Sequence, residues 1–88
     1  MSKISKEKKD RLKEEILHSL YENYPKMMWT FEIGDIMIRD DEFILKLLME
    51  LKKKRLVMNY EESKGKKVKR KWGMKKEVYE QYKQLLEN

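Results

Sequence analysis

The stretch from Asp41 to Met74 constrains the fold most strongly. The spacing of its apolar residues changes once, from that of a helix to that of a strand, and no linker separates the two parts. Residues 41–54 carry apolar side chains at helical spacing, namely Phe43, Ile44, Leu47, Leu48 and Leu51. The segments VMNYEES and KVKRKWGM then alternate with a period of two, and KGK separates them. The stretch therefore predicts a helix over about 41–54 that leads directly into a β-hairpin over about 56–74.

Alternation within the hairpin predicts which side chains face the core. The inward set comprises Leu56, Met58 and Tyr60 in the first strand and Val68, Arg70, Trp72 and Met74 in the return strand. The opposite face of the return strand then carries Lys67, Lys69 and Lys71. These three lysines are expected to form a ladder that faces solvent.

Two helices are predicted before this stretch and one after it. An apolar stripe through Leu12, Ile16 and Leu20 predicts a helix over about 5–24, which Ser5 can cap and Pro25 ends. After a short extended piece over 26–29, Thr30 can cap a second helix over about 31–38. Gly34 weakens this second helix but would allow another backbone to approach closely.

The last helix is expected over about 75–87, where Val78, Tyr79, Tyr82, Leu85 and Leu86 recur at helical spacing. A chain of 88 residues supports one modest core, so a single domain over 1–88 is expected. The predicted order is α-β-α-α-β-β-α, a mostly helical α+β fold.

Charge is distributed unevenly along the chain. Residues 1–50 hold 9 Lys and Arg against 11 Asp and Glu, whereas residues 51–88 hold 13 against 5. The basic half coincides with the hairpin, which is the pattern expected when one face meets a polyanion. The abundance of Lys and Glu without Cys also gives the composition an archaeal or thermophile-like character.

Six cations lie within eight residues of the hairpin: Lys64, Lys66, Lys67, Lys69, Arg70 and Lys71. Lysines on an exposed strand can simply protect a sheet edge from aggregation. This density exceeds what edge protection requires, because the cations repel one another unless an anion is present. The cluster therefore favours contact with a nucleic-acid backbone, and four or five phosphate contacts predict a slope of log affinity against log salt of about −4.

The sequence resembles the winged helix-turn-helix superfamily, in particular the small MarR-, PadR- and penicillinase-repressor-type regulators. Trp29-Thr30-Phe31-Glu32-Ile33 looks like the start of the first helix of the motif, and Leu47–Val57 is similar to a recognition helix entering the wing. Lys71-Trp72-Gly73-Met74 looks like the return strand before a C-terminal helix. The resemblance implies binding of double-stranded DNA, as a homodimer, by a transcriptional regulator or a DNA-organising protein.

The resemblance also implies roles for individual residues. Besides the six hairpin cations, Arg39, Lys46 and Lys53 are expected to contact DNA. The predicted subunit interface comprises Leu45, Met49, Tyr79, Tyr82 and Leu86. The chain departs from the usual DNA-binding pattern at the start of the third helix, where Asp40, Asp41 and Glu42 stand, and at Leu45 and Met49, where polar side chains are usual.

Two other functions compete with DNA binding. A protein-interaction domain would use the exposed face around Leu45 and Met49, and RNA binding ranks lower because only Tyr60 and Trp72 are candidates for stacking on bases. The sequence has no Gly-rich phosphate loop, no pairing of nucleophile and base, no cysteine, and only one histidine, His18. It predicts neither an enzyme nor a metal, cofactor or small-molecule site. The chain also lacks a membrane-spanning run, so a cytoplasmic protein is expected.

Overall fold

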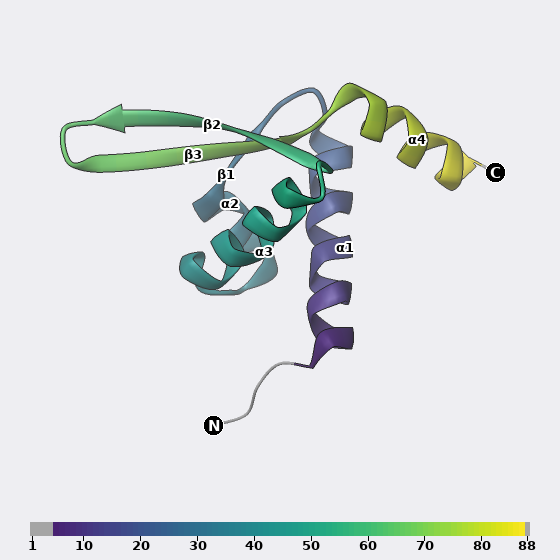
Figure 1. Ribbon diagram of the computed structural model, residues 1–88, viewed down its shortest axis with the longest axis horizontal. Helices are drawn as coiled ribbons and strands as arrows, with labels where there is room; N and C mark the ends of the chain where they lie inside the picture. Colours follow the sequence, from purple (N-terminus) through teal and green to yellow (C-terminus); the bar gives the residue numbers. More distant parts are fainter. Residues whose placement is uncertain (1–4, 88) are drawn as a thin grey trace.

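The computed structural model describes residues 5–87 and confirms the predicted order of elements (Figure 1). The elements are α1 (Lys6–Asn23), β1 (Met28–Trp29), α2 (Thr30–Met37), α3 (Asp41–Lys53), β2 (Val57–Lys64), β3 (Lys67–Met74) and α4 (Lys76–Glu87). The first three helices lie on one side of the β2–β3 hairpin, whose tip extends beyond them, and α4 lies near the C-terminal end of α1.

The core lies where α1, α2 and α3 meet the base of the sheet. It comprises Leu12, Ile16, Leu20, Met28, Ile33, Ile44, Leu47, Leu48, Leu51, Val57, Trp72 and Met74. The apolar stripes predicted for α1 and α3 supply most of these residues, because one face of each helix must be buried against the other elements. An ion pair between Lys13 on α1 and Glu50 on α3, 2.8 Å long, lies beside the same contact.

The sheet has the strand order β1-β3-β2, and both pairings are antiparallel. The short β1 contributes two pairs, Met28 with Trp72 and Trp29 with Lys71. The hairpin pairs from Val57 with Met74 to Lys64 with Lys67, leaving a two-residue loop. Gly65 begins that loop with φ +60°. Residues other than glycine rarely adopt this backbone conformation, which two-residue hairpin loops commonly require.

The predicted inward set of β2 is wrong by one residue. Val57 is buried, whereas Met58 is 44% and Tyr60 58% exposed. The cause is the way α3 ends. The backbone N–H of Leu56 donates to the carbonyl of Leu51 at 3.0 Å, so Leu56 closes the helix and packs against the core instead of starting the strand. The alternation therefore begins at Val57.

Val68 was also predicted to face the core, and it is 48% exposed. It does lie on the same face of the sheet as Trp72, with Ser63 as its cross-strand partner, but it lines an open groove between the hairpin and α3. Alternation fixes the face on which a side chain lies. Burial further requires an element covering that face.

The turn between α2 and α3 is tight around Gly34, as expected. A Cβ at this position would lie 2.6 Å from Asp41 Oδ1 and 3.1 Å from the Arg39 carbonyl oxygen. Ile38 ends α2 in the left-handed conformation, with φ 54°, and its side chain is 85% exposed. Asp40 then caps α3 by accepting a hydrogen bond from the Glu42 N–H at 3.4 Å.

Tyrosine rings hold α4 against the end of α1. The Tyr79 ring stacks on Tyr24, with centroids 4.0 Å apart, and on Tyr21 at 5.0 Å. Tyr82 lies 5.0 Å from Tyr21 in a tilted arrangement. Burial raises the pKa of the Tyr82 phenol, and the nearby Glu14 carboxylate and Tyr21 raise it further. Within residues 5–87, no helix is both long and apolar enough to cross a membrane.

Candidate nucleic-acid interface

Three of the predicted DNA-binding cations gather at the tip of the hairpin. Lys64 and Lys67 form the last cross-strand pair, and Lys66 lies in the loop between them; all three are exposed. We call Lys64, Lys66 and Lys67 the wing-tip cluster. Like charges directly opposite one another destabilise a sheet. Within residues 5–87 none of the three forms an ion pair, although Glu62 lines a pocket with Lys64 and Lys67, so an external anion would relieve their mutual repulsion further.

The other three hairpin cations already have partners in the chain. Arg70 Nε lies 3.1 Å from Glu61 Oε1, across the strand pair. Lys71 is half-buried, with its Nζ 4.7 Å from the centre of the Trp29 ring. Lys69 lies opposite Glu62, with its Nζ 5.9 Å from the same ring. The sequence did not reveal these partners, which leave the wing tip as the most strongly cationic part of the hairpin.

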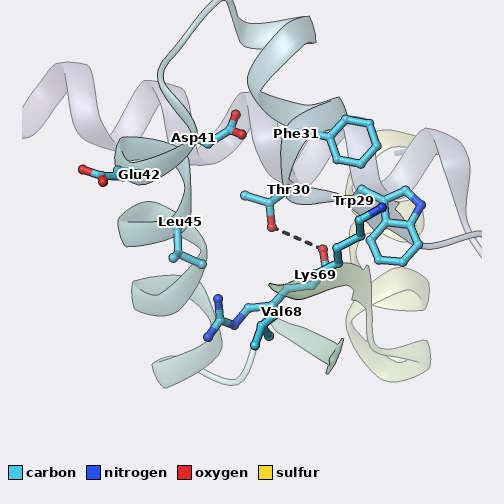
Figure 2. Close-up of a pocket in the computed structure, with 9 residues that line it drawn as sticks. Trp29, Thr30, Phe31, Asp41, Glu42, Leu45, Val68 and Lys69 are labelled. Carbon is cyan, nitrogen blue, oxygen red and sulfur yellow. Dashed lines mark hydrogen bonds between the residues drawn. The ribbon is translucent and has the colours of Figure 1, made fainter. Parts of the chain in front are cut away.

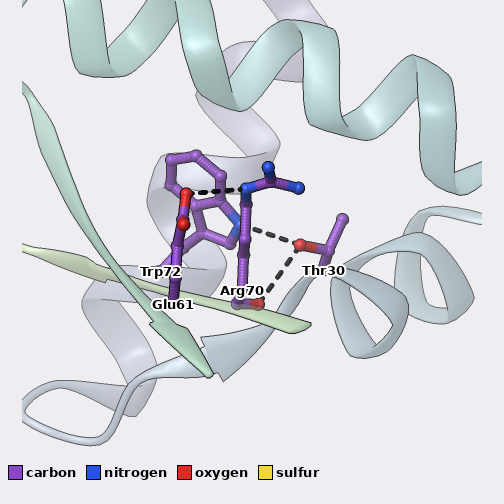
Figure 3. A network of polar contacts seen from close by, with 4 residues as sticks. All are labelled: Thr30, Glu61, Arg70 and Trp72. Atoms are coloured by element: carbon purple, nitrogen blue, oxygen red, sulfur yellow. Dashed lines mark hydrogen bonds and ion pairs between the residues drawn. The ribbon is translucent and has the colours of Figure 1, made fainter. Parts of the chain in front are cut away.

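A half-buried hydrogen-bond network fixes the hairpin relative to α2 (Figure 3). The indole Nε1–H of Trp72 donates to Thr30 Oγ1 at 2.8 Å, and the Thr30 hydroxyl donates to the Arg70 carbonyl at 3.2 Å. The prediction that Thr30 caps α2 is therefore wrong. Its hydroxyl points to the sheet, where it satisfies the indole, and Glu32 Oε1 instead accepts the Trp29 backbone N–H at 2.9 Å.

A groove separates α3 from the hairpin (Figure 2). Glu42 and Leu45 line it on α3, Phe31 at the start of α2, and Val68, Lys69 and Arg70 on β3. Its floor is therefore apolar, with carboxylates on the α3 side and cations on the hairpin side. In this arrangement the first turn of α3 presents negative charge, which repels a phosphate backbone.

The acidic residues at the start of α3 have structural roles. Asp40 caps the helix, and the Asp41 carboxylate packs over Gly34. Carboxylates in the first turn also interact favourably with the helix dipole. Asp41 and Glu42 both line the groove. The predicted contacts Arg39, Lys46 and Lys53 are all exposed, the first in the turn before α3 and the other two on the helix.

The predicted interface residues do not form one surface. Leu45 was expected to be exposed, but it is half-buried because it packs against the core beside the groove. Met49, four residues later, is 48% exposed. Tyr79 and Tyr82 contact α1 of the same chain, whereas Leu86, at 55% exposed, and Leu85, at 75%, are accessible at the end of α4.

Sequence reasoning missed Trp29 and Phe31 as surface residues. Their rings stack with centroids 6.3 Å apart, and Phe31 is 48% exposed. Trp72, which was considered for base stacking, is completely buried. The placement of Trp29 beside Lys69 and Lys71 depends on pairing of β1 with β3, about 40 residues away, and no local signal in the sequence indicates that pairing.

Comparison with known proteins gives a likeness to a solved structure. No protein-family model matches the chain, and neither does any curated protein. The crystal structure of a point mutant of MepR, from a multidrug-resistant S. aureus clinical isolate, superposes with a TM-score of 0.67 and 17% identity, over 80% of this chain and 50% of that one. The chain thus spans half the length of that structure. Together with the order of its helices, short first strand and β-hairpin, this likeness shows that the chain has the winged helix-turn-helix fold.

Proposed function

We propose that this chain binds double-stranded DNA and acts as a small transcriptional regulator or a DNA-organising protein. The observation that carries the proposal is the wing-tip cluster, which places three cations without ion-pair partners among residues 5–87 on a hairpin that extends beyond the helical body. Phosphates are the anions that such a cluster suits, and the helix-turn-helix fold is one that places a helix in the major groove of DNA.

In the proposed complex, α3 lies along the major groove and the hairpin holds the adjacent backbone. Lys46 and Lys53, both exposed on α3, would reach phosphates on either side of the groove. The wing-tip cluster would contact phosphates beside the minor groove. Arg70 contributes less, because its ion pair with Glu61 must open before it can bind DNA.

Base reading by the first turn of α3 has little support. Asp40 caps the helix, and Asp41 and Glu42 could accept hydrogen bonds only from the amino groups of cytosine or adenine. Contacts to phosphates position a protein without reading sequence. We therefore expect binding that depends weakly on base sequence, which favours the DNA-organising role over recognition of a single operator.

The test replaces the wing-tip cluster with alanine, as Lys64→Ala, Lys66→Ala and Lys67→Ala together. The matched control removes three exposed lysines away from the hairpin, Lys8, Lys76 and Lys83, and so lowers the net charge equally. Affinity for a 30-base-pair duplex of random sequence is measured by fluorescence anisotropy. The wing-tip variant should lose most of its affinity for every duplex, whereas the control should bind about as tightly as the parent protein. Equal losses of affinity in both variants would mean that net charge, and not the wing-tip cluster, determines binding.

We also propose that the chain forms a homodimer through the end of α4, where Leu85 and Leu86 are exposed.

The competing function is a protein-interaction domain, and the exposed Phe31 and Val68 along the groove support it. That function predicts a protein complex that Leu45→Lys and Met49→Lys abolish, with DNA binding unchanged.

A further inference from the structure

The sheet has an outer face that combines aromatic rings with lysines. Trp29 and Tyr60 are both cross-strand partners of Lys71, so the three side chains form one row, since antiparallel partners project on the same side. Tyr60 is 58% exposed and Trp29 is half-buried. We call this row, together with Lys69 and the exposed Phe31 beside Trp29, the outer aromatic face.

Within residues 5–87 no helix covers this face, and only the Met27 side chain packs over its base, at Gly73. The helices α1, α2 and α3 lie on the opposite side of the hairpin, which is why Trp72 and Met74 on the inner face are buried (Figure 1). The neighbouring cross-strand pair is Met58 with Gly73, and Met58 is also 44% exposed. Exposed aromatic and thioether groups gathered on one face are typical of a binding surface. Lysines that only kept the strand solvated would not require such groups beside them.

We propose that the outer aromatic face binds the unpaired strand of DNA where a duplex ends or opens. Aromatic side chains stack on unpaired bases, and adjacent cations hold the backbone. Bases inside a duplex are stacked on each other and present no open face to Tyr60, so the rings serve only a strand that has left the duplex. The proposal rests on the duplex binding proposed above.

The geometry gives the strand a path. Lys67, Lys69 and Lys71 follow one another along this face of β3 at intervals of two residues, or about 6.7 Å. The path begins at the wing-tip cluster, which is proposed to hold the duplex, and continues towards the base of the sheet. Bases could then stack on Tyr60 at one side of β3 or on Trp29 and Phe31 at the other. Glu62, opposite Lys69, is the carboxylate on this face and keeps the backbone on the β3 side.

The test compares a blunt 30-base-pair duplex with the same duplex carrying an eight-nucleotide dT tail. Tyr60→Ala removes an exposed ring, and Tyr60→Phe is the matched control that keeps it. We expect the parent protein to prefer the tailed duplex, and Tyr60→Ala to weaken tailed binding at least about 5-fold, the equivalent of one stacked base. Binding to the blunt duplex should not change, and Tyr60→Phe should behave as the parent.

Tryptophan fluorescence supplies a second readout. Trp72 is completely buried, so an unpaired dT strand that stacks on the protein should quench only Trp29, and Trp29→Phe should abolish the quenching. Equal affinity for blunt and tailed duplexes would overturn the inference while leaving duplex binding intact. Binding of the tail without any binding of the blunt duplex would instead overturn the proposed function. Tighter binding of a uridine tail than of the dT tail would overturn the assignment to DNA.

Discussion

Replacing Thr30 with valine should destabilise the protein far more than the same replacement of a solvent-exposed threonine would. The Thr30 hydroxyl is the acceptor for the indole N–H of Trp72, at 2.8 Å, and Trp72 is completely buried. Valine keeps the shape but leaves the indole donor unsatisfied, which costs about 1–3 kcal/mol. It also removes the hydrogen bond to the Arg70 carbonyl. We therefore expect the free energy of unfolding to fall by about 2 kcal/mol.

Urea unfolding followed by circular dichroism measures this change, and Thr30→Ser is the control because it retains the hydroxyl. A double-mutant cycle with Trp72→Phe isolates the hydrogen bond. In the phenylalanine background no indole donor remains, so Thr30→Val should cost less than it does in the parent by about 1 kcal/mol or more. An equal cost in both backgrounds would refute the reasoning, because the threonine would then matter for packing alone.

Three further changes test other parts of the fold. Ile38→Gly should raise the free energy of unfolding by about 1 kcal/mol in the same urea assay, because a β-branched residue holds φ 54° there while its side chain is 85% exposed; a loss of stability would contradict the left-handed helix end. Glu50→Gln should destabilise the protein near neutral pH and progressively less in acid. The hydrogen bond from Lys13 holds the pKa of Glu50 below its ordinary value of 4.5, so its contribution is present above 4.5 and is lost as pH falls through the lower folded-state pKa. A stability difference that stayed constant down to strongly acidic pH would refute this. Tyr79→Ala should release α4, measured as faster amide hydrogen exchange throughout that helix, since its ring stacks on Tyr24; unchanged exchange would contradict that role.

Element order and most of the core follow from the sequence because they depend on local period. The stripes of α1 and α3, the stop at Pro25 and the close approach at Gly34 are all properties of neighbouring residues. The phase of β2 could not be derived in the same way. Alternation has two phases, and the end of α3 selects between them by using Leu56 as part of its terminal hydrogen bonding.

The candidate site was predictable only in its charge. The density of lysine in the hairpin is a matter of composition, and the wing-tip cluster follows from it once the turn is located at Gly65. Which cations have partners depends on cross-strand register, as for the ion pair of Arg70 with Glu61, and on the distant pairing that brings the Trp29 ring to Lys71. Those contacts depend on tertiary structure, so no local pattern in the sequence predicts them.

The most direct test of the central claim, that the wing tip binds duplex DNA, is the salt dependence of affinity for a random 30-base-pair duplex. Each phosphate contact contributes about −0.9 to the slope of log affinity against log salt, so four contacts predict about −3.6. Alanine at Lys64, Lys66 and Lys67 should make that slope shallower by about 2.7. Absence of binding at low salt, or a slope that the triple variant leaves unchanged, would contradict the account.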